Sequence, residues 1–142
     1  PSAAPVDTAA DVAAINAVRD HEMALVAAGN TDSLAAVYAA DVVMMPPNEP
    51  AVTGLEAART WAQSMFSQVT VSGRYTTSQV TVSGDWAVDR YTGSLTATPK
   101  AGGPATEEQI KGIHVLQRGT DGAWRIVQDV WNSDAPPPPP GK

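Results

Sequence analysis

Apolar residues recur at helical spacing in the first part of the chain. The spacing predicts a long amphipathic helix that starts near Thr8, where Asp11 follows three residues later, and ends at Gly29-Asn30. The apolar stripe comprises Val12, Ile15, Val18, Leu25 and Val26. Such a stripe packs against the rest of the domain.

Two further helices and a strand are predicted between residues 34 and 68. A short helix with Leu34, Val37 and Tyr38 on one side is expected to end near Ala40. Residues 41–45, DVVMM, then indicate a buried strand that Pro46-Pro47 closes. The spacing in Thr53-Gly-Leu-Glu56 is typical of a capping box and predicts a third helix. Its apolar members are Leu55, Ala58, Ala62, Met65 and Phe66.

From about residue 69 the pattern becomes β-like. Segments 69–83 and 86–98 are rich in Thr, Val, Tyr and Trp, and Gly84-Asp85 between them suits a tight hairpin. After a loose loop, residues 112–134 contain two more strand-like runs around Asp121-Gly122, a pair that favours a primed turn. Four long strands are therefore expected.

Helices followed by a mostly antiparallel sheet define an α+β domain over residues 7–133, with three N-terminal helices on one face of a strongly curved sheet. Residues 1–6 are expected to be a flexible arm. Residues 134–142 are expected to be a disordered, proline-rich tail, because proline lacks the amide donor that sheets and helices need. The cone-shaped hollow between helix and sheet is a favourable place for a small ligand.

Composition excludes several classes of function. The net charge of −6 leaves no basic stripe for nucleic acid, and no apolar run approaches the ~20 residues that cross a bilayer. There are no cysteines, and the two histidines lack metal-binding spacing, so no metal site is expected. The Ala- and Pro-rich first residues favour export, periplasmic or secreted, with a cytoplasmic location left open.

The order of elements, together with AADVVMMPP, TGLE and GIHVLQRGTDGAWRIVQDVWNSD, resembles the nuclear transport factor 2-like superfamily over residues 7–133. The chain is most similar to its SnoaL-like and ketosteroid isomerase-like bacterial members. The resemblance implies a cone-shaped fold, a homodimer formed commonly through the outer sheet face, and a ligand pocket without a cofactor. This scaffold hosts isomerases, dehydratases, hydrolases and cyclases as well as non-catalytic modules, so the resemblance implies the fold more than the activity.

The ketosteroid isomerases use a tyrosine, an aspartate base and an oxyanion-binding aspartate. Carried onto this chain, the three positions fall on Glu22, Pro46 and, approximately, Ile113. None matches, which disfavours a steroid isomerase of that mechanism.

Glu22 is the first candidate catalytic residue. It falls on the stripe of Ile15, Val18 and Leu25, so it should face inward. Burial would raise the pKa of its carboxyl group and suit it to acid/base work. The alternative is that Glu22 reaches a backbone donor or a basic side chain at the helix margin.

Asp129 is the second candidate. Strict alternation places it with Trp131 on the inner face of the last strand, and places Trp124 on the outer face or in a dimer contact. There it would orient a polar substrate beside an aromatic wall. The alternative is a cross-strand pair with Lys111 or Arg90 that does no chemistry.

His114 is the third candidate, because its ordinary pKa suits proton transfer. The register that turns Ile113 and Val115 inward turns His114 outward, unless a bulge at Gly112 shifts it. A structural or interfacial histidine is the alternative.

Apolar and aromatic side chains at inward positions are expected to bind the substrate or to form core. These are Met44, Trp61, Met65, Tyr91 and Trp131. They favour a flat or bulky apolar molecule over a sugar phosphate, since the chain has no glycine-rich phosphate loop or arginine clamp.

The predicted function is therefore binding of a small hydrophobic molecule, with cofactor-free acid/base catalysis of an isomerase, cyclase or hydrolase kind. The alternative is a non-catalytic dimeric interaction or assembly module that uses the outer sheet face. A metal-dependent enzyme would need a His114–carboxylate cluster, which the spacing along the chain does not predict.

Overall fold

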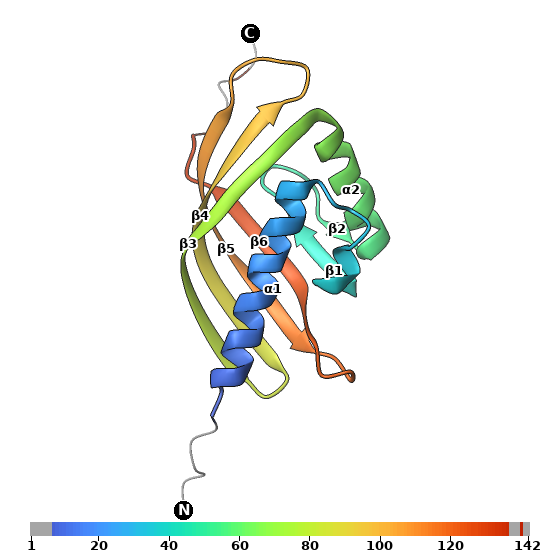
Figure 1. The fold of residues 1–142 in the computed structure, drawn as a ribbon, viewed down its shortest axis with the longest axis vertical. Coiled ribbons are helices and arrows are strands. Elements are labelled where there is room, and N and C mark those ends of the chain that lie inside the picture. Colours follow the sequence, from blue (N-terminus) through green and yellow to red (C-terminus); the bar gives the residue numbers. More distant parts are fainter. Residues whose placement is uncertain (1–6, 137–139, 141–142) are drawn as a thin grey trace, which may run out of the picture.

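The computed structural model describes residues 7–136 and residue 140. The predicted arm at 1–6, and residues 137–139 and 141–142 of the predicted tail, lie outside the described residues. The elements, labelled in Figure 1, are α1 (Ala9–Ala28), a 3-10 turn η1 (Leu34–Ala36), β1 (Tyr38–Met45), β2 (Val52–Thr53), α2 (Leu55–Gln68), β3 (Val69–Ser83), β4 (Trp86–Pro99), β5 (Thr106–Arg118) and β6 (Trp124–Ser133).

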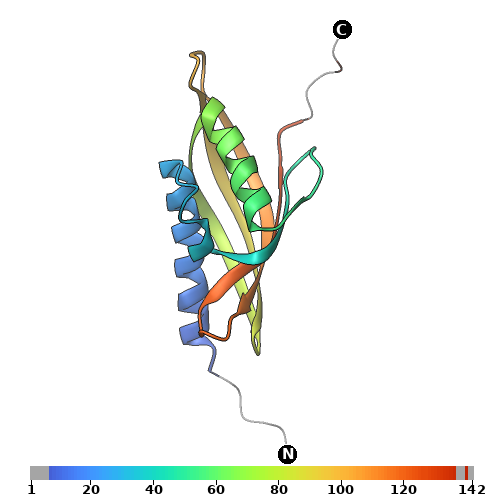
Figure 2. The ribbon, with the colours of Figure 1, turned by 90° about the vertical axis from the view of Figure 1, so that its right-hand side faces the viewer.

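The strands form one curved sheet in the order β2-β1-β6-β5-β4-β3. The β1–β6 pair is parallel and the other pairs are antiparallel. Figure 2 shows both helices on the same side of this sheet. The α+β architecture expected from the sequence is thus confirmed. No helix within the described residues is long and apolar enough to cross a membrane.

The prediction of three helices is wrong in one respect. The expected second helix is only the single turn η1, and Tyr38 already belongs to β1. The reason is pairing with β6: Ile126 N donates to Val37 O at 2.8 Å, and Tyr38 lies opposite Ile126. These backbone groups therefore serve the sheet and cannot continue a helix.

Local signals at two element ends also gave different structures from those expected. Gly54, at φ +94°, occupies the position before α2, and no side chain caps this helix end, so the predicted capping box is absent. Glu56 instead pairs with Arg59. The Gly84-Asp85 hairpin is confirmed, but residues 119–123 form a longer loop rather than a two-residue primed turn.

A β-bulge in β6 reverses one prediction about the tryptophans. The pairing of β5 with β6 shifts between Val115 and Leu116, which leaves Val127 as an extra residue. Trp124 therefore faces the interior, as Trp131 does, and is 4% exposed. Its Nε1 donates to Asp11 of α1 at 3.3 Å. The expected outward position of Trp124 was wrong because strict alternation cannot anticipate a bulge.

The buried face of α1 carries charge as well as apolar groups. Ile15 and Leu25 are buried, and Arg19 and Glu22 are buried on the same face between them. Charged side chains at such positions need partners, because an isolated buried charge is costly. Those partners come from the sheet.

Candidate functional site

Three ionisable residues form a row across the inner face of the sheet. Asp89 of β4 lies directly opposite His114 of β5, and His114 lies directly opposite Asp129 of β6. Their exposed fractions are 0%, 1% and 3%. The expectation that His114 points outward is wrong: its neighbour Ile113 takes the outer face and is 40% exposed.

His114 is held between the two carboxylates. Its Nδ1 lies 3.6 Å from Asp89 Oδ2, and its Nε2 lies 3.4 Å from Asp129 Oδ1. Burial alone would lower the pKa of His114, but the carboxylates of Asp129 and Asp89 beside its two nitrogens raise it to about 10. The imidazole ring is therefore positively charged at neutral pH.

Asp89 is fixed as an anion from the other side. Arg19 Nη1 donates to Asp89 Oδ2 at 3.2 Å, and Ser78 Oγ donates to Asp89 Oδ1 at 2.6 Å. Burial opposes ionisation, yet the nearby His114, the hydrogen bond from Ser78 and the charge of Arg19 lower the pKa of this carboxyl group. Arg19 and Asp89 were not among the predicted site residues. Arg19 could have been found, because it shares the helical stripe with Glu22.

Glu22 lies inside the molecule, as its place on the stripe indicates. Its carboxyl group is contacted by two tyrosines: the Tyr38 hydroxyl lies 3.1 Å from Oε1, and Tyr75 donates to Oε2. Burial raises the pKa of Glu22, with the negative charge of Asp129 acting in the same direction and His114 opposing it. The alternative partners, a backbone donor or a basic side chain, are not the ones observed.

Tyr38 links the two candidate carboxyl groups. Its hydroxyl lies 3.1 Å from Glu22 Oε1 and also 3.1 Å from Asp129 Oδ2. One hydroxyl has one hydrogen and can donate it to only one carboxylate. A proton on one of the two carboxyl groups would satisfy both contacts, and the raised pKa of Glu22 favours that group.

This assignment balances the buried charges. Arg19 and His114 are positive, Asp89 and Asp129 are negative, and a protonated Glu22 adds nothing. An ionised Glu22 would leave one unpaired negative charge in a water-poor interior, which is costly. Burial and charge balance therefore both favour the protonated form of Glu22.

The expected cross-strand partners of Asp129 are not used. Lys111 pairs with Asp134, and Arg90 donates to Gln79, so both basic residues serve other groups. The sheet instead gives Asp129 the partners His114 and Tyr38.

The same geometry brings Glu22, His114 and Asp129 together. One ligand-type atom of each lies within 4.8 Å of the others, so the His114–carboxylate cluster that the sequence spacing did not predict is present. His114, however, is an imidazolium whose nitrogens face anions, and tyrosine hydroxyls occupy the Glu22 carboxyl. The arrangement is that of a proton network.

A cavity of about 410 Å³ opens onto this network. Glu22, Tyr38, Tyr75, Tyr91 and Asp129 line its polar, buried end. The remaining lining is mostly apolar and includes the predicted residues Met44, Trp61, Met65 and Trp131. Trp61 and Trp131 meet edge to face with ring centres 6.0 Å apart. This size and lining suit a small organic molecule.

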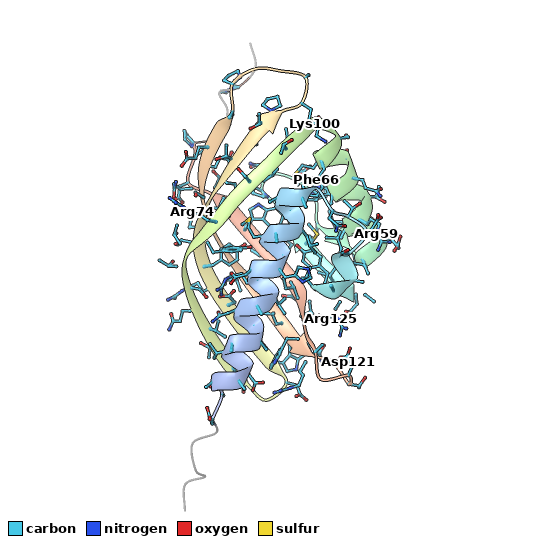
Figure 3. The ribbon with its side chains drawn as sticks, in the orientation of Figure 1. Arg59, Phe66, Arg74, Lys100, Asp121 and Arg125 are labelled. Carbon is cyan, nitrogen blue, oxygen red and sulfur yellow. The ribbon has the colours of Figure 1, made fainter. Side chains whose placement is uncertain are left out.

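Figure 3 draws the side chains of the described residues on the ribbon. Phe66 lies between α1 and α2, whereas the labelled basic residues lie at the periphery of the molecule. The labelled basic residues are Arg59, Arg74, Lys100 and Arg125. His114 and Arg19 do not line the cavity. His114 contacts the lining residue Asp129, and Arg19 contacts Asp89, which lies on the other side of His114.

These features define an α+β cone with a buried carboxyl–tyrosine network at the end of an apolar cavity. The chain belongs to the SnoaL-like domain family, whose model matches residues 18–128. No curated protein is significantly similar in sequence.

Solved structures share the fold. A ketosteroid isomerase-like protein from Erwinia carotovora atroseptica is 25% identical, with 87% of this chain and 96% of that one covered and a TM-score of 0.77. A Xanthomonas campestris protein provisionally named a calcium/calmodulin dependent protein kinase II association domain is 26% identical, with 96% and 95% covered and a TM-score of 0.75.

A third structure, from Streptomyces avermitilis, is provisionally named a dehydratase from the NTF2-like (nuclear transport factor 2-like) family. It is 17% identical to this chain, with 92% of this chain and 100% of that one covered and a TM-score of 0.80. The nuclear transport factor 2-like fold is thus shown, and it is shared by proteins whose names indicate different functions.

Proposed function

We propose that this protein binds a small hydrophobic molecule in the cavity and catalyses proton transfer on it without a cofactor, as an isomerase or dehydratase does. The observation that carries the proposal is the Tyr38 hydroxyl, which bridges the carboxyl groups of Glu22 and Asp129 at the polar end of the cavity. An acid and a base set side by side by their environments are the requirement for such chemistry.

The roles follow from the charges. Asp129 removes a proton from a carbon next to a substrate carbonyl, and the carbonyl oxygen receives the proton of Glu22, which yields an enol. Asp129 then gives its proton to a different carbon while the enol O–H proton returns to Glu22, which forms the isomer and restores the starting state with atoms and charge balanced. The Tyr38 hydroxyl, in contact with both carboxyl groups, holds them side by side through this exchange.

His114 is a positioning residue in this scheme. It lies next to Asp129 and Asp89 rather than in the cavity lining, and it places a positive charge beside the Asp129 carboxyl group. Asp89, Arg19 and Ser78 hold His114 in that state by fixing the counter-charge behind it. The open cavity beside a buried carboxyl favours this function over a purely structural domain.

The proposal can be tested without knowing the natural substrate. The protein is incubated in D₂O with 2-acetylnaphthalene, a flat apolar ketone, and NMR follows the replacement of its acetyl protons by deuterium. Wild type should exchange them at least about a hundredfold faster than Glu22→Gln, which cannot supply the proton. Glu56→Gln, an exposed carboxylate on α2, is the matched control and should behave as wild type.

Saturation-transfer NMR on the same samples reports binding separately. If the ketone binds but wild type and Glu22→Gln exchange its protons at the same rate, the catalytic role is withdrawn and only ligand binding remains. If the ketone does not bind at all, the proposed function as a whole is rejected.

A second candidate function, self-association through the outer sheet face, is favoured by a separate observation. Trp86, Val88 and Ile113 lie on that face of β4 and β5 and are 48%, 40% and 40% exposed. Exposed apolar patches mark interaction surfaces. If they form a homodimer, Val88→Lys should convert the dimer to a monomer in light scattering, whereas Gln63→Lys, at an exposed position of α2 on the other side of the sheet, should not; a monomeric wild type would exclude this dimer.

A further inference from the structure

The cavity has a pronounced charge asymmetry. Four of its lining residues are acidic, namely Glu22, Glu49, Glu108 and Asp129, and none is lysine, arginine or histidine. Glu49 is exposed and Glu108 is half-buried, so these two flank the cavity toward solvent. A negatively charged ligand would approach two carboxylates and end beside Asp129 with no cation in the lining to receive it.

The polar end also holds an unused hydrogen-bond donor. Tyr91 lines the cavity and is 4% exposed, and its hydroxyl makes no hydrogen bond to any residue that the structure describes. The tyrosines at 38 and 75, by contrast, are both committed to Glu22. Burial and the negative charge of Asp129 raise the pKa of Tyr91, so this hydroxyl keeps its hydrogen.

The backbone keeps the Tyr91 hydroxyl in place. Tyr91 lies opposite Gly112 in the sheet, and a Cβ at Gly112 would fall 2.5 Å from the hydroxyl oxygen. Its ring also meets Tyr75 edge to face, with the ring centres 4.8 Å apart, and packs against His114 at 4.7 Å. The donor is therefore held rigidly over a glycine that leaves room for it.

From these observations we infer that the ligand is an uncharged ring compound with a carbonyl or hydroxyl oxygen, that Tyr91 donates a hydrogen bond to this oxygen, and that the acidic lining excludes carboxylates. The inference rests on the proposed function and deepens it by naming the substrate class. It assigns to Tyr91 a specificity role that its aromatic character alone does not indicate.

Three probes of matched shape test it by calorimetry: 2-acetylnaphthalene, 2-ethylnaphthalene and 2-naphthoate. Tyr91→Phe should weaken binding of the ketone about three- to tenfold, the worth of one neutral hydrogen bond, and leave the ethyl compound within about twofold. Comparing the two ligands in both proteins separates the hydrogen bond from packing. Equal losses for both ligands, or no loss for the ketone, would overturn the role of Tyr91.

A second comparison tests whether the acidic lining excludes carboxylates. Wild type should bind 2-naphthoate at least about tenfold more weakly than the ketone. The double variant Glu49→Gln/Glu108→Gln should reduce this difference in affinity severalfold. Glu56→Gln/Glu107→Gln makes the same change in net charge at residues outside the cavity lining and should leave the difference unchanged. Binding of naphthoate as tight as that of the ketone overturns the exclusion.

The outcomes keep the two proposals apart. If the ethyl compound and the ketone both bind but do not respond differently to Tyr91→Phe, the substrate class is wrong while the ligand cavity stands. If none of the three probes binds, both proposals are rejected.

Discussion

The protein should lose stability as the pH rises above about 6.5, because His114 holds its proton in the folded state. The pKa of His114 is about 10 in the fold against 6.5 in the unfolded chain. Below pH 6.5 both states carry the proton. Above it the unfolded chain releases the proton while the folded protein keeps it, so folding becomes less favourable until about pH 10.

The magnitude follows from the pKa difference. Each pH unit in this window costs at most about 1.4 kcal/mol, so stability should fall by about 2–3 kcal/mol between pH 7 and pH 9. The side chain is 1% exposed, so solvent screening reduces this little. The groups that face it are Asp89, Asp129, Glu22 and the Tyr75 and Tyr91 rings. A raised pKa of Glu22 acts in the same direction, because its proton too is held more tightly in the fold.

Urea unfolding followed by tryptophan fluorescence measures the effect at pH 6, 7, 8 and 9. His114→Gln should abolish most of the slope, whereas His21→Gln, at an exposed position on α1, should retain it. A wild type whose stability is flat or rises from pH 6.5 to 9 would refute the imidazolium between two carboxylates.

Three more perturbations have expected results. Tyr38→Phe should slow deuterium exchange of the ketone probe about a hundredfold while the probe still binds, because the hydroxyl that holds the carboxyl groups of Glu22 and Asp129 side by side is lost; an unchanged exchange rate would contradict the role of this bridge. Gly112→Ala should lower the free energy of unfolding by about 1–3 kcal/mol, since the new methyl group crowds the Tyr91 hydroxyl and a backbone oxygen; urea titration checks this, and a neutral effect would contradict the tight packing. Trp124→Phe should cost about 1–2 kcal/mol by the same assay, because it removes the hydrogen bond to α1 and weakens the stacking under Arg118; no loss would show that this contact is unimportant.

The sequence predicted what strong periodicity determines. The stripe of α1 placed Glu22 on the buried face, and the runs at 69–83 and 86–98 match β3 and nearly all of β4. The resemblance to the nuclear transport factor 2-like superfamily supplied the cone and its lining. These features depend on local spacing, which a single sequence shows.

The phase of β5 could not be predicted in the same way. Either face of this strand could be turned toward the interior. One face carries Ile113 and Val115, and the other carries Gly112 and His114. Apolarity alone turns the first pair inward, yet the observed interior takes the second, because Asp89 and Asp129 on the adjacent strands compensate the charge of His114. Such compensation depends on contacts between strands far apart in sequence.

The bulge at Val127 could not be predicted from the alternation of apolar and polar residues along β6 either. It determines the face of the sheet on which Trp124 lies. The prediction of a second helix was wrong for a related reason: strand pairing between Tyr38 and Ile126 outweighs the local helical pattern. In each case a tertiary partner overrides the local preference.

The central claim is that Glu22 is a neutral acid near pH 7 although it lies in a protein of net charge −6. Carboxyl-resolved ¹³C NMR of wild type, with Glu22→Gln to assign the resonance, measures this directly. The account predicts that the Glu22 resonance titrates well above its ordinary value of 4.5 and keeps its protonated chemical shift at pH values where exposed glutamates are ionised. A Glu22 that titrates at or below 4.5 would contradict the bridged, charge-balanced network and the acid/base function built on it.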